Sequence, residues 1–240
     1  MCIRDSLSRE DRFIELVHTL EKHGMLGTSQ HLAQIYSGLP AALKEKVARI
    51  DLPLSELKSL REGLANESVK EFLGSKDFKS LPKEDRFIEL VHTLEKHGLL
   101  GTSHNLSHIY SGLPAVLKEQ VACISLPLAE LKSLREGLAN ESVKEFLDSS
   151  DFKGLSKEDR FIELVLTLEK HRLLGTSQNL GQIYSGLPAS LKEQVARIDL
   201  PLSELKSLRD GLANGVVKEL LGSEELLGLS KEDRFIELVL

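Results

Sequence analysis

The sequence predicts an all-α fold, a tandem helical repeat array, on three observations. The segment Asp-Arg-Phe-Ile-Glu-Leu-Val starts at Asp11, Asp85, Asp159 and Asp233, always 74 residues apart. Within each copy, apolar residues recur at the spacing of amphipathic helices. No segment alternates apolar and polar residues for long enough to indicate a strand. A fixed period of this kind is typical of repeat proteins.

The copies are close in sequence. Residues 11–84 and 85–158 are identical at 60 of 74 positions, and residues 85–158 and 159–232 at 56 of 74. Such closeness is typical of recent duplication, so a residue shared by all copies carries little functional weight. We expect helical repeat 1 over residues 7–84, repeat 2 over 85–158, repeat 3 over 159–232 and the start of repeat 4 over 233–240.

The two ends of the sequence differ from complete copies of the repeat. Residues 1–6, Met-Cys-Ile-Arg-Asp-Ser, match no part of the repeat and resemble the translation of an adaptor used in sequencing libraries. We therefore leave them out of the fold prediction. The fourth copy stops at Leu240, inside its first predicted helix. Both features lead us to expect a fragment of a longer protein.

The first predicted helix of the third copy follows Ser156, whose hydroxyl can cap it, with Asp159 three residues later. Its apolar face consists of Phe161, Ile162, Leu164, Val165 and Leu168. The helix ends before Arg172, where the other copies have Gly24 and Gly98, a typical C-cap residue. If the backbone at that position is in the left-handed conformation, arginine lowers the stability of the fold by on the order of 1 kcal/mol.

Four more helices are expected in the unit. Thr176 or Ser177 can cap the second, and Leu-Pro pairs at Leu187 and Leu200 open the third and fourth, because proline suits the first helical turn. Asn140, in the second copy, caps a short fifth helix. The apolar residues expected to face inward are Leu180, Ile183, Leu191, Val195, Ile198, Leu205, Leu208 and Leu212, with Val143, Phe146 and Leu147 in the fifth helix.

A unit of about five short helices leaves two arrangements open. Two helical hairpins of about 37 residues each would give an α-solenoid-like array in which consecutive copies pack together. Alternatively, the chain is a string of small compact helical domains. Only Lys153, Gly154 and Leu155 separate Phe152 from Ser156, which is too short for a flexible linker. The junction therefore favours the packed array.

Composition argues against several function classes. The net charge is −6, and residues 85–158 hold 8 Lys and Arg against 11 Asp and Glu. A protein that follows a phosphate backbone needs a basic stripe, so the charge opposes nucleic acid and anionic membranes as partners. Outside residues 1–6 the sequence has one cysteine, Cys123, so no disulfide framework is expected. No apolar run reaches the about 18–20 residues of a membrane helix. These features favour the cytoplasm.

Polar positions at the start of the second helix change between copies, while the leucine among them stays constant. The three sets are Gln30, His31 and Gln34; His104, Asn105 and His108; and Gln178, Asn179 and Gln182. The outer two residues of each set are four apart and share a helix face. We take these nine residues as the candidate binding site, a recognition stripe for another protein or a peptide. The alternative is drift on a solvated face, since Gln and His codons differ by one base.

No catalytic or cofactor motif stands out. GxSxG, GxGxxG, GxxxxGK[ST] and HExxH do not occur, so we expect no enzyme and no cofactor. His104 and His108 have a spacing that can chelate a metal, but a zinc site normally needs three or four ligands and no other copy keeps the pair. No metal site is therefore predicted. Asn66 and Asn140 match the glycosylation sequon, but both stand where a helix N-cap is expected.

One stretch of each copy resembles the F-box family. In the second copy, Leu113-Pro114 opens one predicted helix, and the segment from Leu128 to Arg135 has the pattern L-x-x-L-x-x-L-R. The resemblance implies docking to a ubiquitin-ligase adaptor. The downstream aromatic positions of that family are absent. The alternative, which we prefer, is two amphipathic helices joined by a proline turn.

The expected function is a non-enzymatic helical repeat region that acts as a scaffold for binding a protein or peptide. Repetition builds an extended surface, and the acidic charge suits a neutral or basic partner. One alternative is a repeat-based nucleic-acid reader, in which the variable pair of residues in each copy recognises one base. The acidic net charge opposes this function. Another is a structural spacer with no specific partner.

Overall fold

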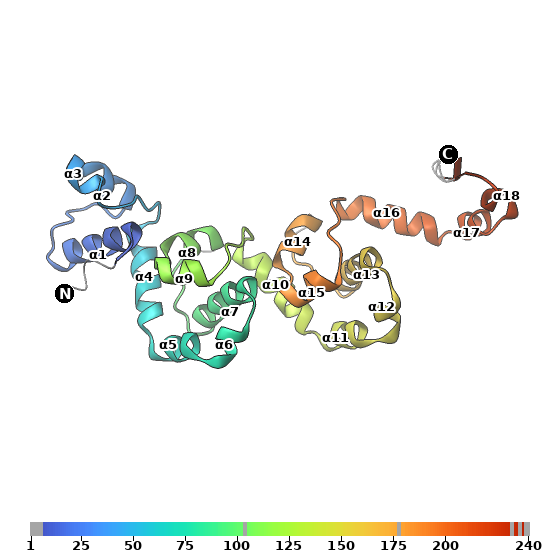
Figure 1. Cartoon of the computed structure of the whole chain (residues 1–240), viewed down its shortest axis with the longest axis horizontal. Helices are drawn as coiled ribbons and strands as arrows, with labels where there is room; N and C mark the ends of the chain where they lie inside the picture. Colours follow the sequence, from blue (N-terminus) through green and yellow to red (C-terminus); the bar gives the residue numbers. More distant parts are fainter. Residues whose placement is uncertain (1–6, 103–104, 177–178, 231–232, 235–236, 238–240) are drawn as a thin grey trace. The chain divides into compact units, whose positions relative to one another are not determined.

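Helices make up the regular secondary structure of the chain wherever the structure describes it. The structure is a computed structural model, which describes residues 7–102, 105–176, 179–230, 233–234 and 237. These residues contain eighteen helices and no strand (Figure 1). The prediction of an all-α fold is confirmed. No helix within the described ranges is long and apolar enough to cross a membrane.

Each copy of the repeat contains six helices in the same order. The first copy has α1 (Arg9–Lys22), α2 (Leu32–Gly38), α3 (Ala41–Lys44), α4 (Leu54–Ala65), α5 (Glu67–Gly74) and α6 (Lys76–Ser80). The second has α7 (Lys83–Lys96), α8 (Leu106–Gly112), α9 (Ala115–Gln120), α10 (Leu128–Ala139), α11 (Glu141–Asp148) and α12 (Ser150–Gly154). The third has α13 (Lys157–Lys170), α14 (Leu180–Gly186), α15 (Ala189–Gln194), α16 (Leu202–Ala213), α17 (Gly215–Leu221) and α18 (Glu224–Leu227).

The expected number of about five helices is too low by one, because a sixth helix follows the predicted fifth. Ser75 stands between α5 and α6 with an extended backbone (φ −66°, ψ 156°). Its hydroxyl donates to the carbonyl oxygen of Phe72 and accepts from the amide of Phe78. One serine thus ends α5 and caps α6. Ser149 does the same between α11 and α12.

Most helix starts follow the capping residues in the sequence. Ser156 caps α13 and Asn140 caps α11, as predicted. The second helix of the third copy differs, because the side chain of Asn179 accepts a backbone amide hydrogen bond at the start of α14. The cap expected from Thr176 is therefore wrong, and Ser177 lies outside the described residues. Because α14 begins at Leu180, the prediction placed this helix start two or three residues too early.

The chain divides into two compact units. Unit 1 consists of Met1–Lys132 and Ser185–Glu193, and unit 2 of Ser133–Tyr184 and Gln194–Leu240. In unit 1, α7 packs against α5 and α6, and α8 packs against α4 (Figure 1). In unit 2, α13 packs against α11 and α12. In both units, the last two helices of one copy therefore pack on the first helix of the next.

One hydrophobic core of unit 1 crosses the boundary between copies. It joins Val69 and Phe78 of the first copy to Phe87 and Val91 of the second, all fully or almost fully buried. A separate core in the same unit lies among α1 to α4, around Phe13. Burial of apolar surface contributes about 25 cal/mol per Å², so the shared core favours contact between the first and second copies.

A buried carboxylate also links consecutive copies in unit 1. Asp11 Oδ1 accepts from the amide of Ala115 at 3.4 Å, and Asp85 Oδ1 from the amide of Ala189 at 3.1 Å. Ala115 and Ala189 are the first residues of α9 and α15, where backbone N–H groups have no acceptor within their own helix. In both cases an aspartate of the preceding copy accepts the hydrogen bond from this amide. The shorter of the two bonds is the one from Ala189 to Asp85.

Arg172 has a left-handed backbone conformation, as the glycines at the same position in the other copies suggested. Its φ is 58°, and the equivalent Gly24 and Gly98 have φ of 64° and 66°. Arg172 is the only non-glycine residue with positive φ in the described part of the chain. An L-residue with a Cβ is strained there by about 1–2 kcal/mol.

Replacing Arg172 with glycine is expected to raise the free energy of unfolding by about 1 kcal/mol, because glycine enters the left-handed region without the Cβ clash. Urea unfolding followed by circular dichroism measures the change. Gly98→Arg is the matched control and should lose a similar amount. Equal stability of the wild type and Arg172→Gly would show that the arginine is not strained.

Replacing Asp85 with alanine is expected to lower the free energy of unfolding by about 1.5–3 kcal/mol, because the partly buried amide of Ala189 loses a charged acceptor. Asp159→Ala is the control, since the side chain of Asp159 hydrogen-bonds only to Ser156 among the described residues. Urea unfolding of both variants makes the comparison. If they lose the same stability, the contact between copies contributes nothing.

Candidate functional site

Two of the candidate binding residues serve as helix caps. The side chains of Asn105 and Asn179 each accept the amide hydrogen two residues ahead, at 2.9 Å in both cases. His31, at the same position in the first copy, also precedes its helix but makes no capping bond with its side chain. Helix capping therefore explains both asparagines without a ligand. His104 and Gln178 lie outside the described residues.

The candidate glutamines lie at the surface. Gln34 is exposed, and its side-chain oxygen accepts from the hydroxyl of Ser29 at 2.9 Å. Gln182 is exposed as well. The carbonyl oxygen of Gln30 accepts from the amide of Leu54 at 2.7 Å, which ties the start of α2 to the start of α4. This segment is therefore held in place by backbone contacts, with its polar side chains directed to the surface.

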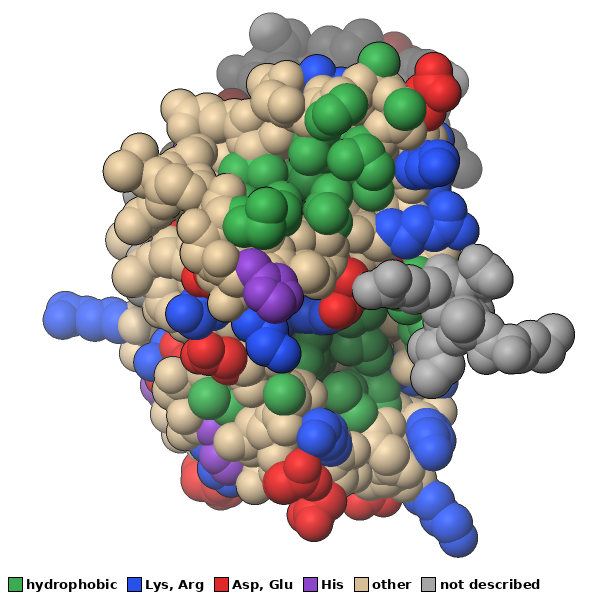
Figure 2. All heavy atoms as spheres, turned by 90° about the vertical axis from the view of Figure 1, so that its left-hand side faces the viewer, with side chains coloured by type: hydrophobic (Ala, Val, Ile, Leu, Met, Phe, Trp, Pro, Cys, Tyr) green, Lys and Arg blue, Asp and Glu red, His purple; other side chains and the backbone are tan. Residues whose placement is uncertain are grey.

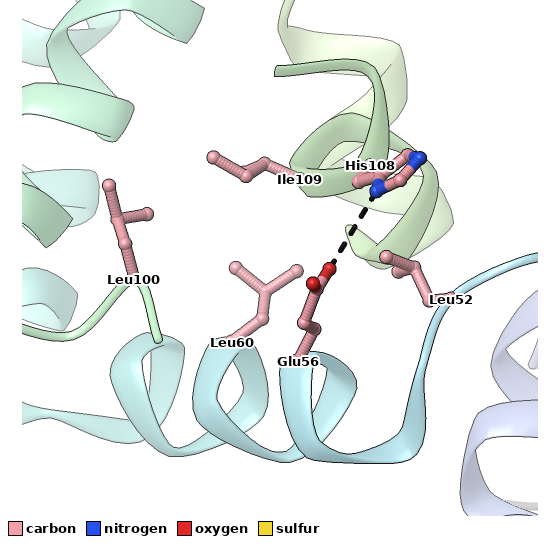
Figure 3. Close-up of a pocket in the computed structure, with 6 residues that line it drawn as sticks. All are labelled: Leu52, Glu56, Leu60, Leu100, His108 and Ile109. Carbon is pink, nitrogen blue, oxygen red and sulfur yellow. Dashed lines mark ion pairs between the residues drawn. The ribbon is translucent and has the colours of Figure 1, made fainter. Parts of the chain in front are cut away.

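His108 lies in a recess of unit 1, between α4 of the first copy and α8 of the second (Figure 3). The lining residues are Leu52, Glu56, Leu60, Leu100, His108 and Ile109. The cavity volume is about 10 Å³. A cavity needs about 10–15 Å³ to hold one water, so the recess admits the end of a single donor group and is too small for a cofactor.

Glu56 and His108 face each other across this recess (Figure 3). His108 Nδ1 lies 3.8 Å from Glu56 Oε2, and the two side chains are 47% and 16% exposed. This distance is too long for a hydrogen bond. Glu56 Oε2 is buried and has no hydrogen-bond partner among the described residues. A buried acceptor without a partner costs about 1–3 kcal/mol, so the recess offers a carboxylate oxygen to a donor from outside.

Nothing in the sequence of a single copy distinguishes Glu56 from its neighbours. The residue recurs as Glu130 and Glu204, and its spacing is that of an exposed helix face. Its surroundings are made by the following copy, so no pattern within one copy marks it. The variable His108 was expected on an open stripe, and the structure places it against the preceding copy. The change from glutamine to His108 at this position was the one feature of the sequence that indicated the recess.

Lysines accompany the buried aspartates that link the copies. Lys118 donates to the carbonyl oxygen of Ser111 at 2.7 Å. Burial lowers the pKa of Lys118, while the negative charges of Glu10 and Asp11 act in the opposite direction. Burial lowers the pKa of Lys192 in the same way. These lysines offset the charge of the buried aspartates, which is a structural role.

The described residues contain no ready metal centre. No group of three or more His, Cys, Asp or Glu side chains in those ranges is placed to hold a metal ion. The recess holds one carboxylate and one imidazole, fewer than the three or four ligands of a zinc site. Cys123 is exposed and forms no disulfide.

Comparison with known proteins assigns no family. No family model matches the chain, and neither curated proteins nor solved structures include a match. The resemblance of Leu113–Arg135 to the F-box family therefore gains no support.

Replacing Glu56 with leucine is expected to raise the free energy of unfolding by about 1 kcal/mol, because it removes an unpartnered buried oxygen and adds apolar contact. Thermal or urea unfolding measures the gain. Glu204→Leu is the control, since Glu204 is exposed and the change should stay within about 0.5 kcal/mol. A clear loss of stability in Glu56→Leu would instead show that the pair with His108 holds the copies together.

Proposed function

We propose that the chain is a non-enzymatic helical repeat scaffold that binds a protein or peptide segment at the recess between consecutive copies. One observation carries the proposal: the buried Oε2 of Glu56 has no hydrogen-bond partner among the described residues and faces a small, partly open recess. A lysine or arginine side chain supplies donors and positive charge to such an oxygen. His108, half exposed at the edge of the recess, can pack against the same side chain.

A packed, solenoid-like arrangement of the copies is part of this proposal. Two observations support it over a string of independent domains. The core of unit 1 contains residues from both the first and second copies. Asp11 and Asp85 each accept a hydrogen bond from the copy that follows. Independent domains would keep both the core and these bonds within single copies. In a packed array, a recess forms where two copies meet.

Variation between copies gives such a scaffold selectivity. The equivalents of His108 in the first and third copies are Gln34 and Gln182, whereas Glu56 recurs as Glu130 and Glu204. At the recess of unit 1, Glu56 would attract a basic side chain, and His108 beside it would tune the fit. The net charge of −6 favours a basic partner in the same way.

Selection of peptides against the full chain from a random display library tests the proposal. The selected peptides are expected to share a lysine or arginine at one position. Their affinity, measured by calorimetry, should fall about tenfold in Glu56→Gln, which corresponds to about 1.4 kcal/mol. Glutamine keeps the size of the side chain and removes its charge.

Glu204→Gln is the matched control, because Glu204 occupies the equivalent position but is exposed. It should leave the affinity unchanged. Peptides that bind Glu56→Gln as tightly as the wild type would refute binding at the recess. Failure to select any peptide would favour a structural spacer with no specific partner. Binding of nucleic acid with a steep salt dependence would favour a repeat protein that recognises nucleic acid.

A further inference from the structure

The recess at Glu56 is narrow for the basic side chains that could enter it. Its volume is about 10 Å³, close to the space that one water molecule occupies. A lysine ends in a compact ammonium group with a single nitrogen, whereas an arginine ends in a wider, planar guanidinium group. The size of the recess therefore favours lysine.

Two acceptor atoms face each other across the recess (Figure 3). Glu56 Oε2 is buried without a hydrogen-bond partner among the described residues, and His108 Nδ1 lies 3.8 Å from it. A neutral imidazole with its proton on Nε2 accepts at Nδ1. One nitrogen placed about 2.9 Å from each atom would donate to both, because this is an ordinary hydrogen-bond length. An ammonium group carries several donors on a single nitrogen and suits this arrangement.

The other residues that line the recess are apolar. They are Leu52, Leu60, Leu100 and Ile109. All of them are buried, and their side chains can contact the methylene groups of a lysine. A guanidinium has donors on every nitrogen, and the donors that faced these leucines would lose water without gaining an acceptor. The apolar walls therefore favour lysine as well.

Several other acidic side chains pair with lysines of the chain itself. Glu21 lies 3.5 Å from Lys58, and Glu169 lies 3.1 Å from Lys206. Figure 2 shows Lys and Arg side chains close to Asp and Glu side chains on the face that it draws. Glu56 faces the imidazole of His108 instead. Its buried oxygen is therefore available to a cation from another molecule.

We propose that the recess of unit 1 selects the unmodified ammonium group of a lysine and holds it between Glu56 Oε2 and His108 Nδ1. This inference rests on the proposed function and specifies which side chain enters. The partner is a protein or peptide segment with an exposed lysine. Arginine and trimethyl-lysine are excluded by their size, and acetyl-lysine is excluded because it has lost its charge.

Two peptide display libraries test this selectivity on the full chain at about pH 8, where an imidazole is ordinarily neutral. One library contains lysine as its only basic residue, and the other contains arginine as its only basic residue. The lysine library is expected to yield peptides whose affinity falls in Glu56→Gln. The arginine library is expected to yield no peptide of this kind.

Calorimetry on the selected lysine peptides separates the size of the cation from its charge. Replacing the lysine with arginine or trimethyl-lysine keeps the positive charge, but each change should weaken binding about tenfold because the ammonium hydrogen bonds are lost. His108→Phe keeps a flat ring and removes Nδ1, so the affinity for lysine peptides should fall about fivefold. Gln182→Phe is the matched control, because Gln182 occupies the equivalent position and is exposed. It should leave the affinity unchanged.

The possible outcomes separate this inference from the proposed function. Arginine peptides that bind as tightly as lysine peptides and still depend on Glu56 would overturn the selectivity and leave the proposed function standing. Equal affinity for lysine and trimethyl-lysine would overturn it too, since charge alone would then decide binding. Unchanged affinity in His108→Phe would overturn the bridge to Nδ1. If neither library yields a peptide that depends on Glu56, both the inference and the proposed function are overturned.

Discussion

The close approach of α8 to α4 at Gly112 is the contact on which the rest of unit 1 depends. A side chain at this position would meet Leu52 and Leu60 at less than van der Waals distance. Because glycine at this position allows α8 to contact α4, Ile109 and Leu113 on either side of it lie in the core. The contact of Asp11 with Ala115 and the recess at Glu56 lie along the same boundary. In unit 1, the first copy therefore completes its packing with the second.

Local features were predictable from the sequence, because the residues that form them are close together in the chain. Ser156 and Asn140 cap helices by reaching amides within three residues. Arg172 takes over a glycine position whose conformation the preceding helix fixes. The extra helix after Ser75 escaped prediction because one hydroxyl both ends and starts a helix. That double role leaves no gap in the apolar pattern.

Features that depend on a neighbouring copy were not predictable in this way. Leu60 and Leu208 stand in identical local sequences, yet one is buried and the other is exposed. Glu56 has the spacing of a surface residue, and only the approach of α8 turns it into the floor of a recess. The candidate binding site was chosen from residues that vary between copies, but several of these residues cap helices or lie at the surface. His108 alone, among those described, marks the place where two copies enclose a polar group.

Close identity between copies does not give equivalent residues the same surroundings. Leu52 and Leu60 are covered by α8 of the second copy, whereas the equivalent Leu200 and Leu208 are 40% and 48% exposed. Glu56 lines a recess beside His108, whereas the equivalent Glu204 is exposed. A residue that recurs in every copy therefore need not have the same role in each of them, and what distinguishes Glu56 is the neighbouring copy that packs against it.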